Sequence, residues 1–176
     1  LPATVAHWMA LGKSLFIPSL VRNWYVGRFV DFLRKVKKDN PDSDISIIAH
    51  SFGGWIAEQT ISHLEFPLHS VVYVHCPISA HIEHGFYYSW LTSGKIGKVV
   101  SWSSHEDEVI GYVAIPPFGQ NGYWGFIRQD HPEDRESPVR QPYPLINLYN
   151  EITMEEHTGV LSQIVKYRPR ILDSIN

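Results

Sequence analysis

The sequence predicts an α/β fold in which a mainly parallel central sheet carries helices on both faces. Two observations support this prediction. Short apolar runs rich in β-branched residues, such as residues 45–49 and 70–74, are typical of strands that are buried on both sides. Segments with apolar residues at helical spacing lie between such runs, and this alternation is typical of strands joined by crossover helices.

The first expected helix covers residues 23–38. Its apolar side chains recur every three or four positions, while charged side chains fall between them. The apolar positions are Val26, Phe29, Val30, Leu33 and Val36. The dipeptide Asn40-Pro41 ends this helix, because proline cannot continue it. A second helix is expected directly after Ser51, and Pro67 marks its end.

Further strands are expected at residues 97–102 and 145–149, with a weaker candidate at residues 14–17. Residues 116–144 are dense in proline, glycine, asparagine and charge, so we expect one long loop or lid there rather than core. The length of 176 residues suits one hydrophobic core, and we therefore expect a single domain over residues 1–176.

The composition argues against several classes of partner. A net charge of −3 does not supply the basic field that nucleic acid or an anionic membrane requires. No apolar run approaches the roughly 18 residues of a transmembrane helix, so we expect a soluble protein and place the cytoplasm first among compartments. The single cysteine, Cys76, lies in an apolar run, and we expect a buried and unreactive thiol.

The segment Ala49-His50-Ser51-Phe52-Gly53 has the small-x-Ser-x-Gly pattern of a nucleophile turn. In such a turn a serine joins a strand to a helix in a strained conformation, and its hydroxyl projects from the end of the strand. We expect small residues two positions before and after the serine because these positions pack against each other. The alternative is an ordinary serine in a strand-to-helix turn.

With the following Gly54, which lets the helix approach the sheet closely, this segment resembles the nucleophile segment of the α/β-hydrolases. The resemblance is greatest to their small lipase-like and esterase-like members, and it extends from about residue 14 to about residue 163. It implies an α/β-hydrolase fold whose N-terminal strands are not visible in this sequence. It also implies the chain order nucleophile, acid, histidine.

The resemblance implies Asp107 as the acid and His157 as the base. Asp107 follows the strand at 97–102 and begins an Asp-x-Val pattern, with Glu106 as the alternative acid. His157 opens a segment similar to the family's histidine loop and final helix. A solvated acidic turn and a surface histidine are the competing interpretations of these two residues.

The resemblance further implies two backbone amides that stabilise an oxyanion, one of which belongs to Phe52. The other comes from a loop after an earlier strand, and no such strand is recognisable before residue 14. Without it the strand that ends at Ser51 has an open edge. A truncated chain would account for this, as would a minimal hydrolase that fills the gap with residues 14–17 or with a partner chain.

These features favour a serine hydrolase that cleaves carboxylic esters through an acyl-enzyme, with an acyltransferase, thioesterase or amidase as related possibilities. A non-catalytic, hydrolase-like binding or assembly subunit is the alternative from another class. We expect Tyr87, Trp90 and Trp124 to form the walls of an apolar acyl pocket, unless they only cover the core. The expected mechanism uses no metal and no cofactor.

Overall fold

A computed structural model gives the fold. It describes residues 19–81, 86–112, 118–128, 131, 133, 136, 140–142 and 146–176. The expected strand at residues 14–17 lies outside the described residues. The elements are α2 (Ser19–Asp39), β1 (Ser46–His50), α3 (Phe52–Ile61), β2 (Leu68–Val74), α4 (Tyr87–Thr92), β3 (Ile96–Ser103), α5 (Glu108–Gly111), α6 (Asn121–Trp124), β4 (Leu148–Ile152), α7 (Gly159–Ser162) and α8 (Ile164–Ile175).

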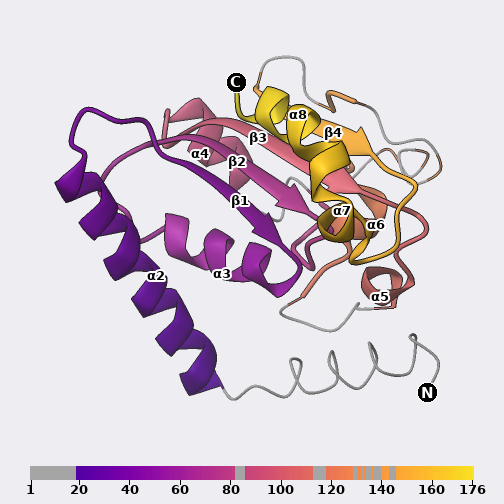
Figure 1. The fold of residues 1–176 in the computed structure, drawn as a ribbon, viewed down its shortest axis with the longest axis horizontal. Helices are drawn as coiled ribbons and strands as arrows, with labels where there is room; N and C mark the ends of the chain where they lie inside the picture. Colours follow the sequence, from indigo (N-terminus) through magenta and orange to yellow (C-terminus); the bar gives the residue numbers. More distant parts are fainter. Residues whose placement is uncertain are drawn as a thin grey trace.

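The four described strands form one parallel sheet in the order β1-β2-β3-β4, so neighbours in the sequence are also neighbours in the sheet (Figure 1). The predicted α/β fold with a parallel sheet is therefore confirmed. The register pairs His50 with Val74 and Val74 with Trp102. The carboxyl ends of the first three strands consequently lie level with one another.

Helices cover both faces of the sheet, as predicted. Val71 and Tyr73 point toward the cluster that contains buried residues of α2, α3 and α4. Val72 and Val74, on the alternate positions, pack against Tyr167 and Ile171 of α8. Burial on both faces explains why these strands are continuous apolar runs rather than alternating ones.

Helix α2 begins earlier than its apolar pattern predicts, at Ser19 instead of residue 23. Its buried residues Val26, Val30 and Leu33 form one stripe, and the helix packs against α3. Fully burying a side chain such as leucine stabilises the fold by about 1.5–3 kcal/mol. This stripe therefore fixes α2 beside the helix that follows Ser51.

Two expectations about the second half of the chain are wrong. Strand β4 begins at Leu148, three residues after the predicted start, because Leu148 is the residue that pairs with Val99. The described residues 118–128, expected to belong to a lid, are packed into the structure. Phe126 is fully buried there and Ile127 nearly so.

Among the described helices, none combines the length and the apolar character needed to cross a lipid bilayer. Cys76 is a free, fully buried cysteine, as predicted. Its Sγ lies 3.3 Å from the carbonyl oxygens of Ala49 and Val74, and burial raises the pKa of its thiol. The thiol is therefore uncharged and enclosed.

Candidate active site

Each strand of the sheet is followed at its carboxyl end by one residue of a shared polar cluster. Ser51 follows β1, His75 follows β2, Asp107 lies four residues beyond β3, and His157 lies five residues beyond β4. The carboxyl ends of parallel strands meet at one edge of a sheet, which is where α/β proteins bind ligands. This topology explains how residues more than 100 positions apart in the sequence become neighbours.

Ser51 lies in a strained turn between β1 and α3. Its backbone angles are φ 53° and ψ −132°, a conformation that residues with a side chain seldom adopt and that costs about 1–3 kcal/mol. The backbone N–H of Ser51 donates to the carbonyl of Val74 at 3.1 Å, which ties the turn to β2. The strand, turn and helix expected around the serine are thus all present.

The glycine requirement of this turn differs in part from the prediction. A Cβ on Gly54 would lie 2.3 Å from Cys76 Sγ and 2.5 Å from Cys76 Cβ, so this glycine does allow α3 to approach β2 closely. A Cβ on Gly53, by contrast, would have no described atom within 4 Å. The expectation that Gly53 must be small to fit against Ala49 is therefore wrong.

Asp107 is fully buried and caps the N-terminus of α5. Its Oδ1 accepts a hydrogen bond from the backbone N–H of Ile110 at 3.0 Å, which leaves Oδ2 free to face two imidazoles. Burial alone would raise the pKa of this carboxyl, but the hydrogen bond from His157 and the close contact with His75 outweigh burial and hold the pKa below its usual value. Asp107 is thus a carboxylate, whereas the alternative acid, Glu106, is exposed.

His157 joins the other two predicted residues. Its Nδ1 lies 2.9 Å from Asp107 Oδ2, and its Nε2 lies 2.8 Å from Ser51 Oγ. A carboxylate only accepts hydrogen bonds, so the proton of the neutral ring is on Nδ1 and Nε2 is free to accept the serine proton. The structure therefore brings Ser51, Asp107 and His157 together in one hydrogen-bonded chain.

His50 contributes a contact that the sequence did not indicate. Its Nε2 lies 2.8 Å from the carbonyl oxygen of His157, and this oxygen can only accept. Burial lowers the pKa of His50, so the ring is neutral and donates through Nε2. His50 thereby connects the end of β1 to the loop that carries His157.

His75 is a second histidine that contacts this cluster without belonging to the predicted serine, acid and base. It is fully buried and has a left-handed backbone, with φ 49°. Its Nε2 lies 3.1 Å from Thr153 Oγ1, and its Nδ1 lies 3.2 Å from Asp107 Oδ2, although the latter contact is not aligned as a hydrogen bond. The available signal was its position directly after a buried parallel strand.

His75, Asp107 and His157 also place one possible ligand atom each within 4.8 Å of one another. Both ring nitrogens of His157 already have hydrogen-bond partners, one of which is the Ser51 hydroxyl. The geometry is therefore accounted for by hydrogen bonding, and we do not assign these residues to a metal.

The oxyanion site is only partly described. Phe52 is the first residue of α3, so its amide has no acceptor within the helix and can serve a bound anion. No second amide donor is identified in the described part of the chain. Strand β1 is an edge of the described sheet, with Ile48 half exposed beside a cavity of about 470 Å³.

The three aromatic residues expected in an acyl pocket occupy different surroundings. Tyr87 and Trp90 belong to the hydrophobic core, and the Tyr87 hydroxyl donates to Glu58 Oε1 at 2.6 Å. The expectation that these two residues form pocket walls is therefore wrong, and the alternative, that they cover the core, is correct. Trp124 is partly buried, and its ring centroid lies 5.3 Å from that of His105, close to the acid loop.

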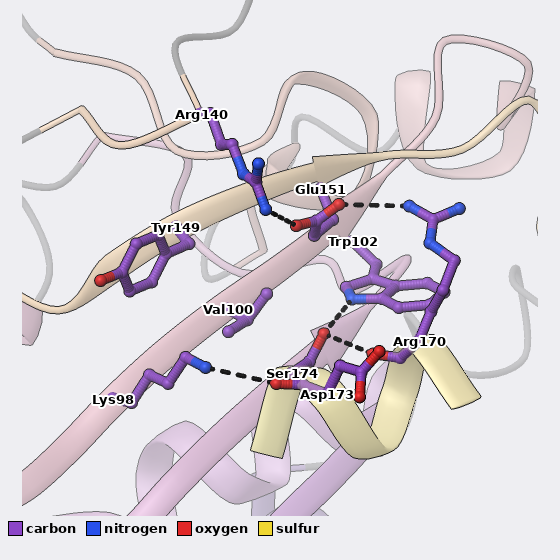
Figure 2. A pocket seen from close by; sticks show the side chains of 9 residues that line it. All are labelled: Lys98, Val100, Trp102, Arg140, Tyr149, Glu151, Arg170, Asp173 and Ser174. Atoms are coloured by element: carbon purple, nitrogen blue, oxygen red, sulfur yellow. Dashed lines mark hydrogen bonds and ion pairs between the residues drawn. The ribbon is translucent and has the colours of Figure 1, made fainter. Parts of the chain in front are cut away.

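A separate cavity of about 410 Å³ is lined mainly by residues of β3, β4 and α8, and none of its lining residues belongs to the polar cluster (Figure 2). Glu151 projects into it between Arg140 and Arg170, with an ion pair of 3.2 Å to each. The Trp102 indole donates to Ser174 Oγ at 3.1 Å. These polar groups already have partners within the protein, so we assign no ligand to this cavity.

No family model matches the sequence, and no curated protein is significantly similar to it. The functional interpretation therefore depends on the geometry of the polar cluster and on general chemistry. The most informative feature is the pair of hydrogen bonds made by His157.

Proposed function

We propose that the protein is a serine hydrolase that cleaves carboxylic esters through an acyl-enzyme. The observation that carries the proposal is the chain from Ser51 Oγ through the two nitrogens of His157 to Asp107 Oδ2, with distances of 2.8 and 2.9 Å. A serine hydroxyl is a weak nucleophile until a base accepts its proton, and a third group must orient that base. This cluster contains all three parts.

In the proposed reaction, His157 Nε2 takes the proton of Ser51 as Oγ attacks the acyl carbonyl carbon. Asp107 holds the imidazole in the required tautomer and stabilises the imidazolium. His157 then returns the proton to the leaving alcohol, and an acyl-serine forms. Water attacks this ester in the same manner and regenerates the free serine.

The amide of Phe52 is the proposed first donor to the oxyanion, since it lies next to the nucleophile at the start of α3. A missing second donor would cost about 10²- to 10³-fold in rate. A catalytically weak, hydrolase-like binding subunit is therefore the second candidate. The two candidates differ in whether Ser51 reacts with an electrophilic acyl or phosphoryl mimic.

The test is labelling of the purified chain with a fluorophosphonate, which forms a stable bond only with an activated serine. We expect one label, located at Ser51 by peptide mass spectrometry, and none in Ser51→Ala. Ser162, an exposed helix serine whose hydroxyl lies 2.9 Å from the Gly159 carbonyl, provides the control variant Ser162→Ala, which should label normally. Labelling that persists in Ser51→Ala, or no labelling of the wild type, would reject the proposal.

Unlabelled wild-type protein would then be compared on esters, thioesters and anilides of one acyl group. The triad does not select the leaving group, so this comparison decides between esterase, thioesterase and amidase activity. We expect the esters to turn over fastest.

A further inference from the structure

Asp107 Oδ2 has a second imidazole beside it, and the mechanism above does not use that ring. His75 Nδ1 lies 3.2 Å from the same oxygen that accepts from His157 at 2.9 Å. The side chains of His75 and Asp107 are both fully buried. An interaction between a carboxylate and an N–H is stronger in such surroundings than in water.

The hydrogen-bond partner of the other nitrogen indicates which tautomer His75 adopts. Thr153 Oγ1 lies 3.1 Å from His75 Nε2 and 3.4 Å from the carbonyl oxygen of Ser103. The Ser103 carbonyl already accepts from the Thr153 backbone N–H at 2.9 Å, so the Thr153 hydroxyl is available to donate to Nε2. Asp107 Oδ2 can only accept, so its contact with His75 Nδ1 is favourable when the proton of neutral His75 is on Nδ1.

The surroundings of His75 also hold it in place. A Cβ on Gly122 would lie 2.5 Å from the carbonyl carbon of His75, so the backbone of α6 packs directly on this residue. The backbone N–H of His75 donates to the carbonyl of Trp102 at 2.9 Å. Among the described residues, His75 Nδ1 has no aligned hydrogen-bond partner, and Asp107 Oδ2 lies 3.2 Å from it. An imidazole held this firmly can restrain the carboxylate that it faces.

We propose that His75 is a positioning residue for the triad. Its Nδ1–H holds the Asp107 carboxylate in the orientation that accepts from His157, and it draws part of the negative charge away from His157. This inference rests on the proposed function. It predicts that loss of the Nδ1 donor both slows the reaction of Ser51 and stabilises the protonated form of His157.

The groups that face His75 and can change charge come from three elements. Asp107 caps α5, His157 precedes α7, and His50 ends β1, with its ring centroid 6.4 Å from that of His75. Burial lowers the pKa of His50 and raises that of the adjacent Cys76, so both stay neutral near neutral pH. Because a lowered pKa places His50 in the acidic range too, the informative comparison is between two variants that both remove the His75 ring and differ only in the donor to Asp107.

The experiment compares His75→Asn with His75→Gln. The asparagine amide can occupy the place of Nδ1 and donate to Asp107, and asparagine tolerates the left-handed backbone. The glutamine amide occupies the place of Nε2 and leaves Asp107 without this donor. The readouts are the rate of fluorophosphonate labelling against pH and the melting temperature of each variant.

We expect His75→Gln to label about tenfold more slowly, which corresponds to the loss of one charge-assisted contact. The acidic midpoint of its labelling rate against pH should move to higher pH. His75→Asn should retain most of the labelling rate and the wild-type midpoint. Unchanged rate and midpoint in His75→Gln would overturn the inference. Equal slowing of both variants with an unchanged midpoint would also overturn it, since that is the result of a purely structural role.

A second measurement separates this inference from the proposed function. Nitrogen-15 NMR of the histidine side chains reports the tautomer of His75 and the titration of His157 whether or not the protein is active. The inference requires the proton of His75 on Nδ1 and a His157 titration that moves to higher pH in His75→Gln. A proton on Nε2 would refute the inference even if Ser51 labels, whereas an unlabelled wild type with the expected tautomer would refute only the hydrolase.

Discussion

Replacement of Gly54 by alanine tests the close approach of α3 to β2 that shapes the nucleophile turn. The new Cβ would lie 2.3 Å from Cys76 Sγ and 2.5 Å from Cys76 Cβ. Non-bonded carbon and sulfur atoms need more than 3 Å, so the helix and strand must separate by about 1 Å. Overpacking of this kind costs about 1–3 kcal/mol.

A loss of about 2 kcal/mol lowers the melting temperature of a chain of this size by about 4–8 °C. The measurement is thermal unfolding followed by circular dichroism, together with the rate of Ser51 labelling, which should also fall because the turn moves. Gly53→Ala is the matched control, since its Cβ would have no described atom within 4 Å. Alanine there should leave stability unchanged or raise it by up to about 1 kcal/mol.

Equal melting temperatures for the two variants would refute the packing argument. Equal melting temperatures would mean that Cys76 moves aside without cost, and therefore that the glycine at position 54 does not set the distance between α3 and β2.

Two further predictions concern buried and aromatic side chains. Burial raises the pKa of Glu58, although its hydrogen bond from Tyr87 acts in the opposite direction. Ionisation of Glu58 therefore lowers the free energy of unfolding. This loss is absent below the unfolded-state pKa of about 4.3, and it grows as the pH rises through the folded-state pKa. The melting temperature of the wild type should decrease from pH 5 to pH 8 relative to that of Glu58→Gln, and parallel pH curves would contradict this. Trp124→Ala should alter the preference among ester substrates more than the melting temperature, because Trp124 is only partly buried beside His105; a large loss of stability with unchanged kinetics would make Trp124 a packing residue.

The strands that sequence reasoning located best are those whose apolar runs have polar ends. Strands β1, β2 and β3 differ from their predicted bounds by one or two residues. The run that predicts β4 begins with Leu145 and Ile146, but pairing with β3 selects Leu148 as its first residue. Register is a property of two strands together, and one run alone does not specify it.

The proline- and glycine-rich composition of residues 116–144 was misleading for its described part. Composition predicts a loop, yet Phe118 and Phe126 are buried against elements far away in the sequence. Gly122 has little space for a side chain, because α6 packs on the backbone of His75 and Cys76. A glycine in this region thus serves close packing, which composition alone does not distinguish from flexibility.

The residues of the candidate site were predictable only where a local sequence pattern or the order of residues along the chain indicated them. The turn at Ser51 has a local pattern, and the resemblance supplied the order that places Asp107 and His157 after it. His75 has no such pattern, since its partner Thr153 is 78 residues away. The contact of His50 with His157 spans 107 residues and is formed by a backbone carbonyl, which no residue type reveals.

The distribution of the polar cluster over all four strands has a consequence for partly folded states. The nucleophile follows β1 and the base follows β4, and these two strands are the edges of the described sheet, each five residues long. Local unfolding can open one part of a structure while the rest stays formed. The chain can therefore retain the central strands β2 and β3 while it loses either the serine or its proton acceptor, so chemical competence at Ser51 reports that both edge strands are docked at the same time.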